Sequence, residues 1–175
     1  MSKLLALALS IAVLGGVWAF LALGPLGASE SGPALVLVWV GFIAWGCYFH
    51  TGGDMAALQK TIAGMIYGAV IAGIALWLVG SNPAGLPEGA VAAAIYIAVT
   101  VFLLVIVAGC NVLSVVPANV YGYAATAGYV LSAGDAAGSV TAMDMTNPVL
   151  LIALSTVLGA VFGMLSGKLS GMLGK

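Results

Sequence analysis

The densest group of polar and aromatic side chains lies in one stretch, Trp45-Gly46-Cys47-Tyr48-Phe49-His50-Thr51-Gly52-Gly53-Asp54. The only closely spaced titratable groups of the chain are His50, Asp54 and Lys60. Histidine changes its charge near neutral pH, so a carboxylate partner such as Asp54 would tune a pH-sensitive gate. The alternative is a membrane interface, where Trp, Tyr and His are common and Lys60 extends its amine outward.

A second polar cluster surrounds Pro117 and contains Asn111, Ser114, Asn119, Tyr121, Tyr123, Thr126 and Tyr129. Two amides beside a proline are typical of a broken helix, which offers free backbone groups and amides to a solute if protein or water covers it. The alternative is a cytoplasmic turn, in which Asn and Pro are ordinary residues. The first interpretation predicts a solute pathway along both clusters, formed by Trp45, Tyr48, His50, Asn111, Asn119 and Tyr121.

Aromatic residues recur at three- and four-residue steps at Trp39, Phe42, Trp45 and Phe49. Such a stripe either faces lipid, fills space in a packed core, or forms a slot for a small uncharged solute or a cation. The sequence leaves these alternatives open.

The residue pattern does not indicate catalysis. Cys47 and Cys110 stand alone in apolar runs, so neither a disulfide framework nor a metal cluster is expected. HEXXH, GxSxG and P-loop spacings are absent from the sequence. We therefore expect no enzyme activity, no metal and no cofactor. With four lysines, no arginine and a net charge of -1, nucleic acid is not an expected partner.

The elements that must position these side chains are transmembrane helices. Of the 175 residues, 63% are hydrophobic and 5% are charged, whereas soluble domains carry roughly 25% charged residues. A spanning helix needs about 20 apolar residues. We predict an all-α membrane protein with a single domain, 1–175, and six transmembrane helices at about 4–23, 34–49, 56–79, 89–116, 118–133 and 148–165. The second and fifth are short, and the sixth reaches 173 if its glycine-rich end is helical.

The placement of charges supports six spans with both termini in the cytoplasm. This topology puts all four lysines on one side, as the positive-inside rule requires: Lys3, Lys60, Lys168 and Lys175. Four acids fall on the opposite side, namely Glu30, Glu88, Asp135 and Asp144, whereas Asp54 shares the lysine side. The alternative is a cleaved signal peptide at the N-terminus, which would leave five spans, but its apolar stretch is longer than the usual 7–15 residues.

Glycines at four-residue spacing predict close helix packing, because they leave one helix face without side chains. They are Gly64 and Gly68 in the third helix and Gly159, Gly163, Gly167 and Gly171 in the sixth. Packing within one subunit and a subunit interface are the two alternatives.

The two glycine-rich helices also share the pattern T-[IV]-x-G-x-[IV]-[YF]-G, at 61–68 and 156–163. Because these helices cross in opposite directions, the match predicts two inverted three-helix repeats. The alternative is a chance match in a chain rich in Gly, Ala and Val.

Three motifs occur in a recognisable order over roughly residues 34–170: Trp45-Gly46-Cys47-Tyr48-Phe49 before Gly52-Gly53, then Lys60-Thr61-x-x-Gly64, then Pro117-Ala118 before Gly122. In this order the chain resembles the small bacterial inner-membrane proteins of domain-of-unknown-function family 1097. The resemblance implies a six-span, multi-pass protein of the bacterial inner membrane and no particular activity. A likeness to the urea and amide channels rests on size and span number alone.

These observations lead to one functional hypothesis and one alternative. The hypothesis is a homo-oligomeric channel or facilitator in the lipid bilayer for a small polar solute of the urea/amide, ammonia or small-carboxylate class. Six helices of this size enclose little space alone, which favours a homo-oligomer. The alternative is a non-transporting membrane subunit that assembles with or stabilises a larger membrane complex.

Overall fold

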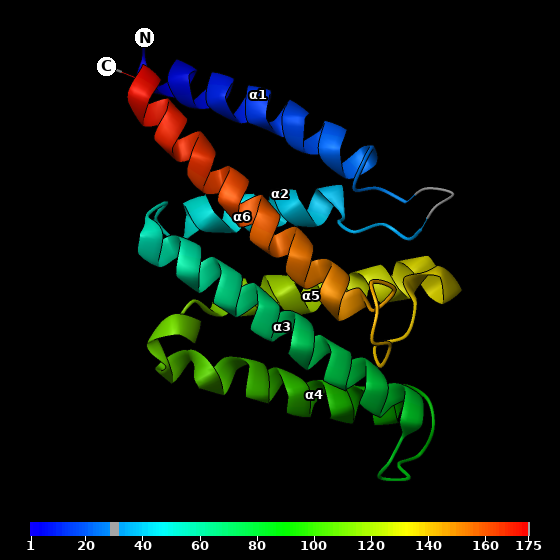
Figure 1. The fold of residues 1–175 in the computed structure, drawn as a ribbon. Helices are drawn as coiled ribbons and strands as arrows, with labels where there is room; N and C mark the ends of the chain where they lie inside the picture. The colour runs from blue at the N-terminus through cyan, green and yellow to red at the C-terminus, as the bar shows by residue number, and fades with distance from the viewer. Residues whose placement is uncertain (29–31, 175) are drawn as a thin grey trace.

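The computed structural model describes residues 1–28 and 32–174 of the chain. In this part of the chain the secondary structure consists of helices, so the prediction of an all-α fold is confirmed. The α-helices are α1 (Lys3–Leu23), α2 (Val38–His50), α3 (Met55–Ser81), α4 (Ala90–Ile106), α5 (Val116–Ala133) and α6 (Pro148–Leu173). Successive helices run in opposite directions, and both termini lie at the same end of the molecule (Figure 1).

Each helix has preferred neighbours, and the pairing has a regular form. The closest pairs are α3 with α5 and α2 with α6, while α3 and α6 also cross each other. On the outside, α1 covers α6 and α4 covers α3 (Figure 1). When α1, α2 and α3 are exchanged with α4, α5 and α6 respectively, each of these pairs becomes a pair that is also observed. By contrast, α2 and α5 make few contacts with each other.

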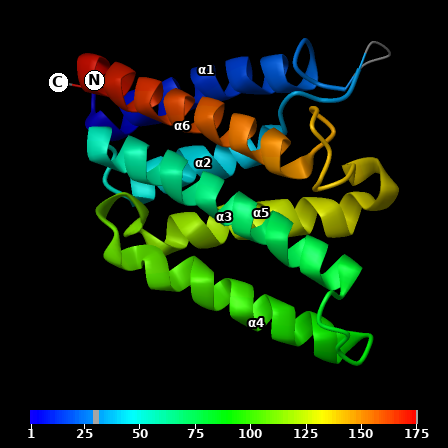
Figure 2. The ribbon, with the colours of Figure 1, turned by 60° about the horizontal axis from the view of Figure 1, so that its bottom comes forward.

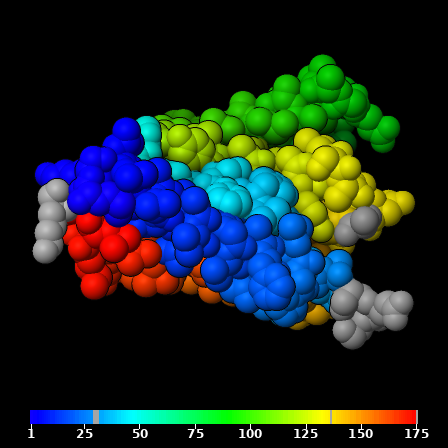
Figure 3. All heavy atoms as spheres, turned by 90° about the horizontal axis from the view of Figure 1, so that it is seen from above, coloured from blue at the N-terminus to red at the C-terminus, as the bar shows by residue number. Residues whose placement is uncertain are grey.

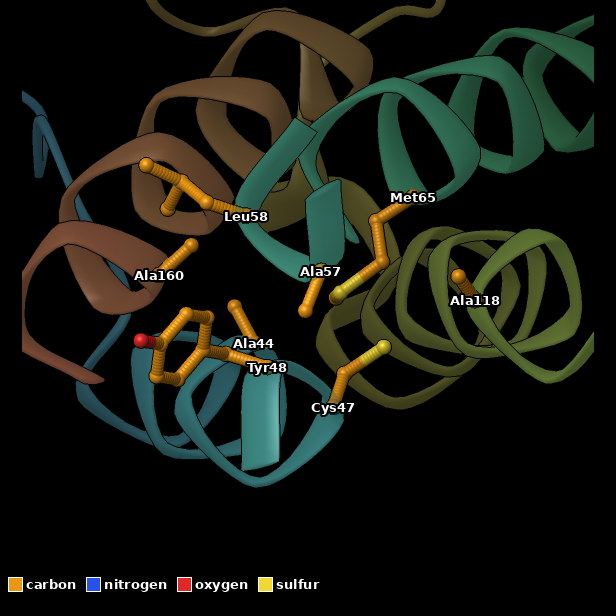
Figure 4. Packing of buried hydrophobic residues seen from close by; sticks show 8 residues of the cluster. All are labelled: Ala44, Cys47, Tyr48, Ala57, Leu58, Met65, Ala118 and Ala160. Atoms are coloured by element: carbon orange, nitrogen blue, oxygen red, sulfur yellow. The ribbon is translucent and has the colours of Figure 1, made fainter. Parts of the chain in front are cut away.

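Small side chains allow the four inner helices to approach closely. One buried cluster joins α2, α3, α5 and α6 (Figure 4) and consists of Ala44, Cys47, Tyr48, Ala57, Leu58, Met65, Ala118 and Ala160. In lipid, the association of helices depends on such van der Waals contact, because apolar surface gains little by leaving an apolar solvent.

Within the described residues, four helical segments are long and apolar enough to cross a membrane: α1, α3, α4 with its extension to Gly109, and α6. The helix α2 is apolar but has 13 residues, which corresponds to about 20 Å. The helix α5 has 18 residues and carries more polar side chains.

The predicted helix 34–49 is wrong at its beginning, because α2 starts only at Val38. The preceding residue Leu37 is extended, with φ -112° and ψ 122°. Its backbone N–H donates to Ser155 Oγ of α6 at 2.8 Å, and Val36 is buried. A contact with a distant helix therefore holds Leu37 in an extended form, and α2 begins only after it.

The predicted helix 89–116 is also wrong at its end. The helix α4 stops at Ile106, and two 3₁₀ turns follow at Val107–Gly109 and Asn111–Leu113. Cys110 between them is extended, with φ -84° and ψ 128°. Pro117 then lies in the first turn of α5, where its missing N–H costs little.

The other boundaries agree with prediction more closely. The helices expected at 4–23, 56–79 and 118–133 are slightly longer in the structure, and α6 continues through its glycine-rich end to Leu173. Lys3, Lys60 and Lys168 lie toward the end with both termini, which we call the lysine end, and Glu88, Asp135 and Asp144 toward the other (Figure 1). Glu30 and Lys175 lie outside the described residues.

Candidate functional site

A groove of about 430 Å³ lies between α2 and α5. Residues three and four positions apart share one face of a helix, and both walls follow this spacing. The groove is lined on the α2 side by Trp39, Phe42, Ile43, Gly46 and Cys47 and on the α5 side by Tyr121, Ala124 and Ala125.

The groove exists because small residues stand where two neighbouring helices would otherwise fill the space. A Cβ added to Gly46 would meet no atom within 4 Å. Trp39 and Phe42 stand at its edge and remain 39% and 43% exposed. The ring of Phe42 stacks on that of Trp45, with centroids 5.8 Å apart, which fixes the orientation of this aromatic wall.

The chemistry of the groove is aromatic and uncharged. Its lining residues with polar side-chain atoms are Trp39, Cys47 and Tyr121, which carry an indole N–H, a thiol and a hydroxyl. The Cys47 sulfur lies 3.5 Å from the Thr61 hydroxyl and 3.9 Å from the Thr51 hydroxyl, within hydrogen-bonding distance of both. Such a surface suits a small neutral solute and offers no positive charge to a carboxylate.

Of the six residues predicted to form a solute pathway, Tyr121 lines this groove. Trp45 is buried on the other side of α2, where its Nε1 donates to Ser166 Oγ of α6 at 3.0 Å. Tyr48 is also buried, and its hydroxyl donates to the Gly53 carbonyl. His50 and Asn111 are exposed at the lysine end.

Asn119, the remaining pathway residue, is fully buried beneath the corner between α4 and α5. Its Nδ2 donates to the carbonyls of Leu104 and Leu113, each at 3.2 Å. Leu104 lies in the last turn of α4, and Leu113 ends the second 3₁₀ turn. Its Oδ1 is buried without a hydrogen-bond partner among the described residues and lies beside Gly64, where an added Cβ would come within 2.7 Å of it. The amide thus connects the broken backbone.

The three residues of the predicted pH gate lie at the end of α2, at the N-cap of α3 and in the second turn of α3. Asp54 is the N-cap of α3, and its Oδ1 accepts a hydrogen bond from the Ala57 N–H at 2.7 Å. His50 is exposed at the last position of α2, and Lys60 lies in the second turn of α3. The capping hydrogen bond therefore explains the position of the Asp54 carboxylate without a histidine partner.

Four of the six predicted packing glycines lie at helix contacts within the chain. A Cβ on Gly64 would come within 2.7 Å of Ala118 on α5, and one on Gly68 would overlap the α5 backbone. On α6, a Cβ on Gly159 would overlap the backbone of Gly41, and one on Gly163 would lie 3.1 Å from the Trp45 and Tyr48 rings.

The last two glycines of the α6 series have more space. At Gly167 an added Cβ would make ordinary contacts of 3.7 Å with Phe49 and Tyr48, and at Gly171 it would meet no atom within 4 Å.

Sequence reasoning missed the residues that hold the beginning of α2. The Trp18 Nε1 of α1 donates to the Val38 carbonyl at 2.9 Å, and its ring covers Gly41. On the other side, Ser155 accepts from Leu37. Two sequence features could have indicated these contacts. They are Ser155 within an apolar helix and Gly41 early in a short helix.

Antiparallel apolar helices, with exposed side chains on α1 and α4 that are largely apolar, define an α-helical membrane protein. A family model described as a protein of unknown function, DUF1097, matches residues 8–171, and the chain belongs to this family. The resemblance stated from the sequence motifs is therefore confirmed. No curated protein and no solved structure matches the chain.

Proposed function

We propose that this protein is a homo-oligomeric channel or facilitator for a small polar solute, which passes along the groove between α2 and α5. The observation that carries the proposal is the position of these two helices. Each is the second helix of its half of the chain, each is shorter than the helix that follows it, and together they line the groove. A pair of short apolar segments at corresponding positions of two halves points to the substrate site in transporters built from inverted repeats.

The proposal includes six membrane spans arranged as two inverted three-helix repeats. The exchange of helix pairs between the halves supports it, as do the equivalent contacts of Gly64 with α5 and Gly159 with α2. Helix α2 covers only about 20 Å of a hydrocarbon core of about 30 Å. The non-helical residues 32–37 would complete the crossing, and the hydrogen bonds of Leu37 with α6 and of Val38 with α1 support a place beside these helices.

The proposed orientation places the lysine end in the cytoplasm, with both termini, and the protein in the bacterial inner membrane. Lys3, Lys60 and Lys168 support this orientation, because cytoplasmic ends of membrane proteins are enriched in lysine and arginine.

A neighbouring copy would close the open side of the groove. The exposed aromatic side chains Trp39 and Phe42 and the free space at Gly46 and Gly128 support a contact there. Close approach at glycine is a common way for membrane helices to associate.

The lining narrows the solute class. Because no charged side chain lines the groove, it favours neutral amides, urea or ammonia over small carboxylates. Aromatic rings would limit solute size, and weak binding at several points would keep the flux passive. We propose no enzymatic step.

Solute flux into proteoliposomes tests this proposal. Urea, acetamide, ammonia, formate and acetate are presented to vesicles with wild-type protein, with Gly46→Leu, or with none. Gly46→Leu fills the groove, whereas Gly16→Leu is its control, because Gly16 on α1 also has no neighbour within 4 Å of an added Cβ. We expect neutral solutes to enter faster than in empty vesicles and Gly46→Leu alone to abolish the difference.

Permeability equal to that of empty vesicles for all five solutes would contradict the proposal, as would unchanged flux in Gly46→Leu. A stoichiometric foreign subunit in a detergent pull-down, together with absent flux, would instead favour the alternative of a non-transporting membrane subunit.

A further inference from the structure

A second pocket, of about 460 Å³, lies at the lysine end. It is formed by α1, the end of α2, the turn before α3 and the last part of α6. Its lining includes Leu7, Phe49, Asp54, Met164, Gly167 and Lys168. The first turns of α1 and the last turns of α6 lie side by side here (Figures 2 and 3), and a Cβ added to Gly174 would lie 3.4 Å from the Cα of Lys3.

The pocket combines an apolar wall with positive charge. Leu7, Phe49 and Met164 supply the apolar side, and Lys168 supplies an ammonium group. Lys3 lies four residues before Leu7, so it occupies the same face of α1 one turn further out. Lys168 therefore lines the pocket, and Lys3 lies one turn beyond Leu7 on the face of α1 that lines it.

One negative charge, Asp54, lies on the α3 side of the same pocket. Its Oδ1 is already used as an acceptor for the Ala57 N–H. Two lysines and one aspartate give a net positive charge of one unit at pH 7, which complements the single negative charge of a phosphodiester.

We propose that this pocket binds the headgroup phosphate of one anionic phospholipid of the cytoplasmic leaflet, with the beginning of an acyl chain against Leu7 and Met164. The neighbouring surface of α1 supports a lipid rather than free phosphate, because Leu4 and Leu5 are 79% and 50% exposed beside Lys3. Basic groups next to a spanning helix attract anionic lipid headgroups. The site does not depend on the proposed transport function.

Thermal unfolding of the purified full-length protein in detergent tests the site when phosphatidylglycerol, phosphatidylcholine or inorganic phosphate is titrated in. Phosphatidylglycerol alone is expected to give a saturable rise of the unfolding temperature. Lys3→Gln and Lys168→Gln should each weaken its apparent affinity roughly fivefold. Lys60→Gln is the control, because Lys60 is at the same end but neither lines the pocket nor lies on the face of α1 that lines it, and it should leave the affinity unchanged.

A second pair of variants separates pocket occupation from surface charge. Gly167→Leu projects into the pocket from a position with ordinary contacts, and Gly171→Leu adds the same side chain where no atom lies within 4 Å. Only Gly167→Leu should abolish the response to phosphatidylglycerol. An equal response to phosphatidylcholine or to phosphate, or a full response in both Lys168→Gln and Gly167→Leu, would overturn the proposal.

Discussion

Glycines with identical spacing have different surroundings in this molecule. Gly159 contacts the backbone of α2, whereas Gly171, twelve residues further along the same helix, has open space around it. The four-residue period places neighbouring glycines on one side of α6, but each step turns by about 40°, so Gly159 and Gly171 lie about 120° apart around the helix. How far the neighbouring helix extends along α6 depends on the length and tilt of α2, which no local pattern specifies.

We predict that Gly159→Ala destabilises the protein by about 1–3 kcal/mol, because the added methyl group overlaps the backbone of Gly41 and forces α2 and α6 apart. Gly171→Ala should instead be neutral or stabilising by up to about 1 kcal/mol, since alanine favours the helix. Denaturant unfolding in detergent measures both. Equal stability of the two variants would contradict the packing described for Gly159.

The buried amide of Asn119 gives a second prediction at this scale. Asn119→Ala removes the donor to the carbonyls of Leu104 and Leu113 and should cost about 1–3 kcal/mol. Amide hydrogen exchange should also accelerate in residues 107–115, where those bonds connect the break. Asn111→Ala, at an exposed position of the same corner, is the matched control. Slow exchange preserved in Asn119→Ala would show that the break is held by other contacts.

At the scale of elements, the sequence predicts helices best where a local residue ends them. Pro148 begins α6, and α1 ends before Gly24-Pro25, as predicted. The two errors, at residues 34–37 and 107–115, have a different origin. There, Ser155 and Asn119 form hydrogen bonds with backbone outside the α-helices, at Leu37 and Leu113, and Trp18 donates to the carbonyl of Val38 at the start of α2.

One wall of the candidate groove could also be predicted from the sequence, and the other could not. The spacing of Trp39 and Phe42 indicates its α2 wall, because aromatic residues at helical steps are visible in a sequence. Its α5 wall consists mainly of alanines, Ala124 and Ala125, which resemble every other small residue in this chain. Only the arrangement of α2 beside α5 identifies them as lining residues.

We predict that Ser155→Ala destabilises the protein by about 1–3 kcal/mol, because the partly buried N–H of Leu37 loses its acceptor. Ser132→Ala on α5 is a suitable control, since its hydroxyl is exposed and bonds only to its own helix. Thermal unfolding compares them. A loss no larger in Ser155→Ala than in Ser132→Ala would mean that the beginning of α2 does not need this bond.

At the scale of the whole molecule, the account depends on two three-helix halves that cross the bilayer in opposite directions. The exchange of helix pairs between the halves and the lysine end both agree with this arrangement. Composition and lysine placement predict it from the sequence. The pairing of α3 with α5 and of α6 with α2 is a property of the folded chain, because helices of similar apolar character could pair in several ways.

Cysteine accessibility measures this arrangement most directly. Cys110 is exposed at the lysine end and Ser139 is exposed at the other end. In a Cys47→Ala background, native Cys110 and, after Cys110→Ser, an added Ser139→Cys are labelled with a membrane-impermeant maleimide. The account predicts that Ser139→Cys reacts in intact cells and that Cys110 reacts only in inverted vesicles. Labelling of both positions from the same side would contradict the six-span, two-half structure and the transport route that depends on it.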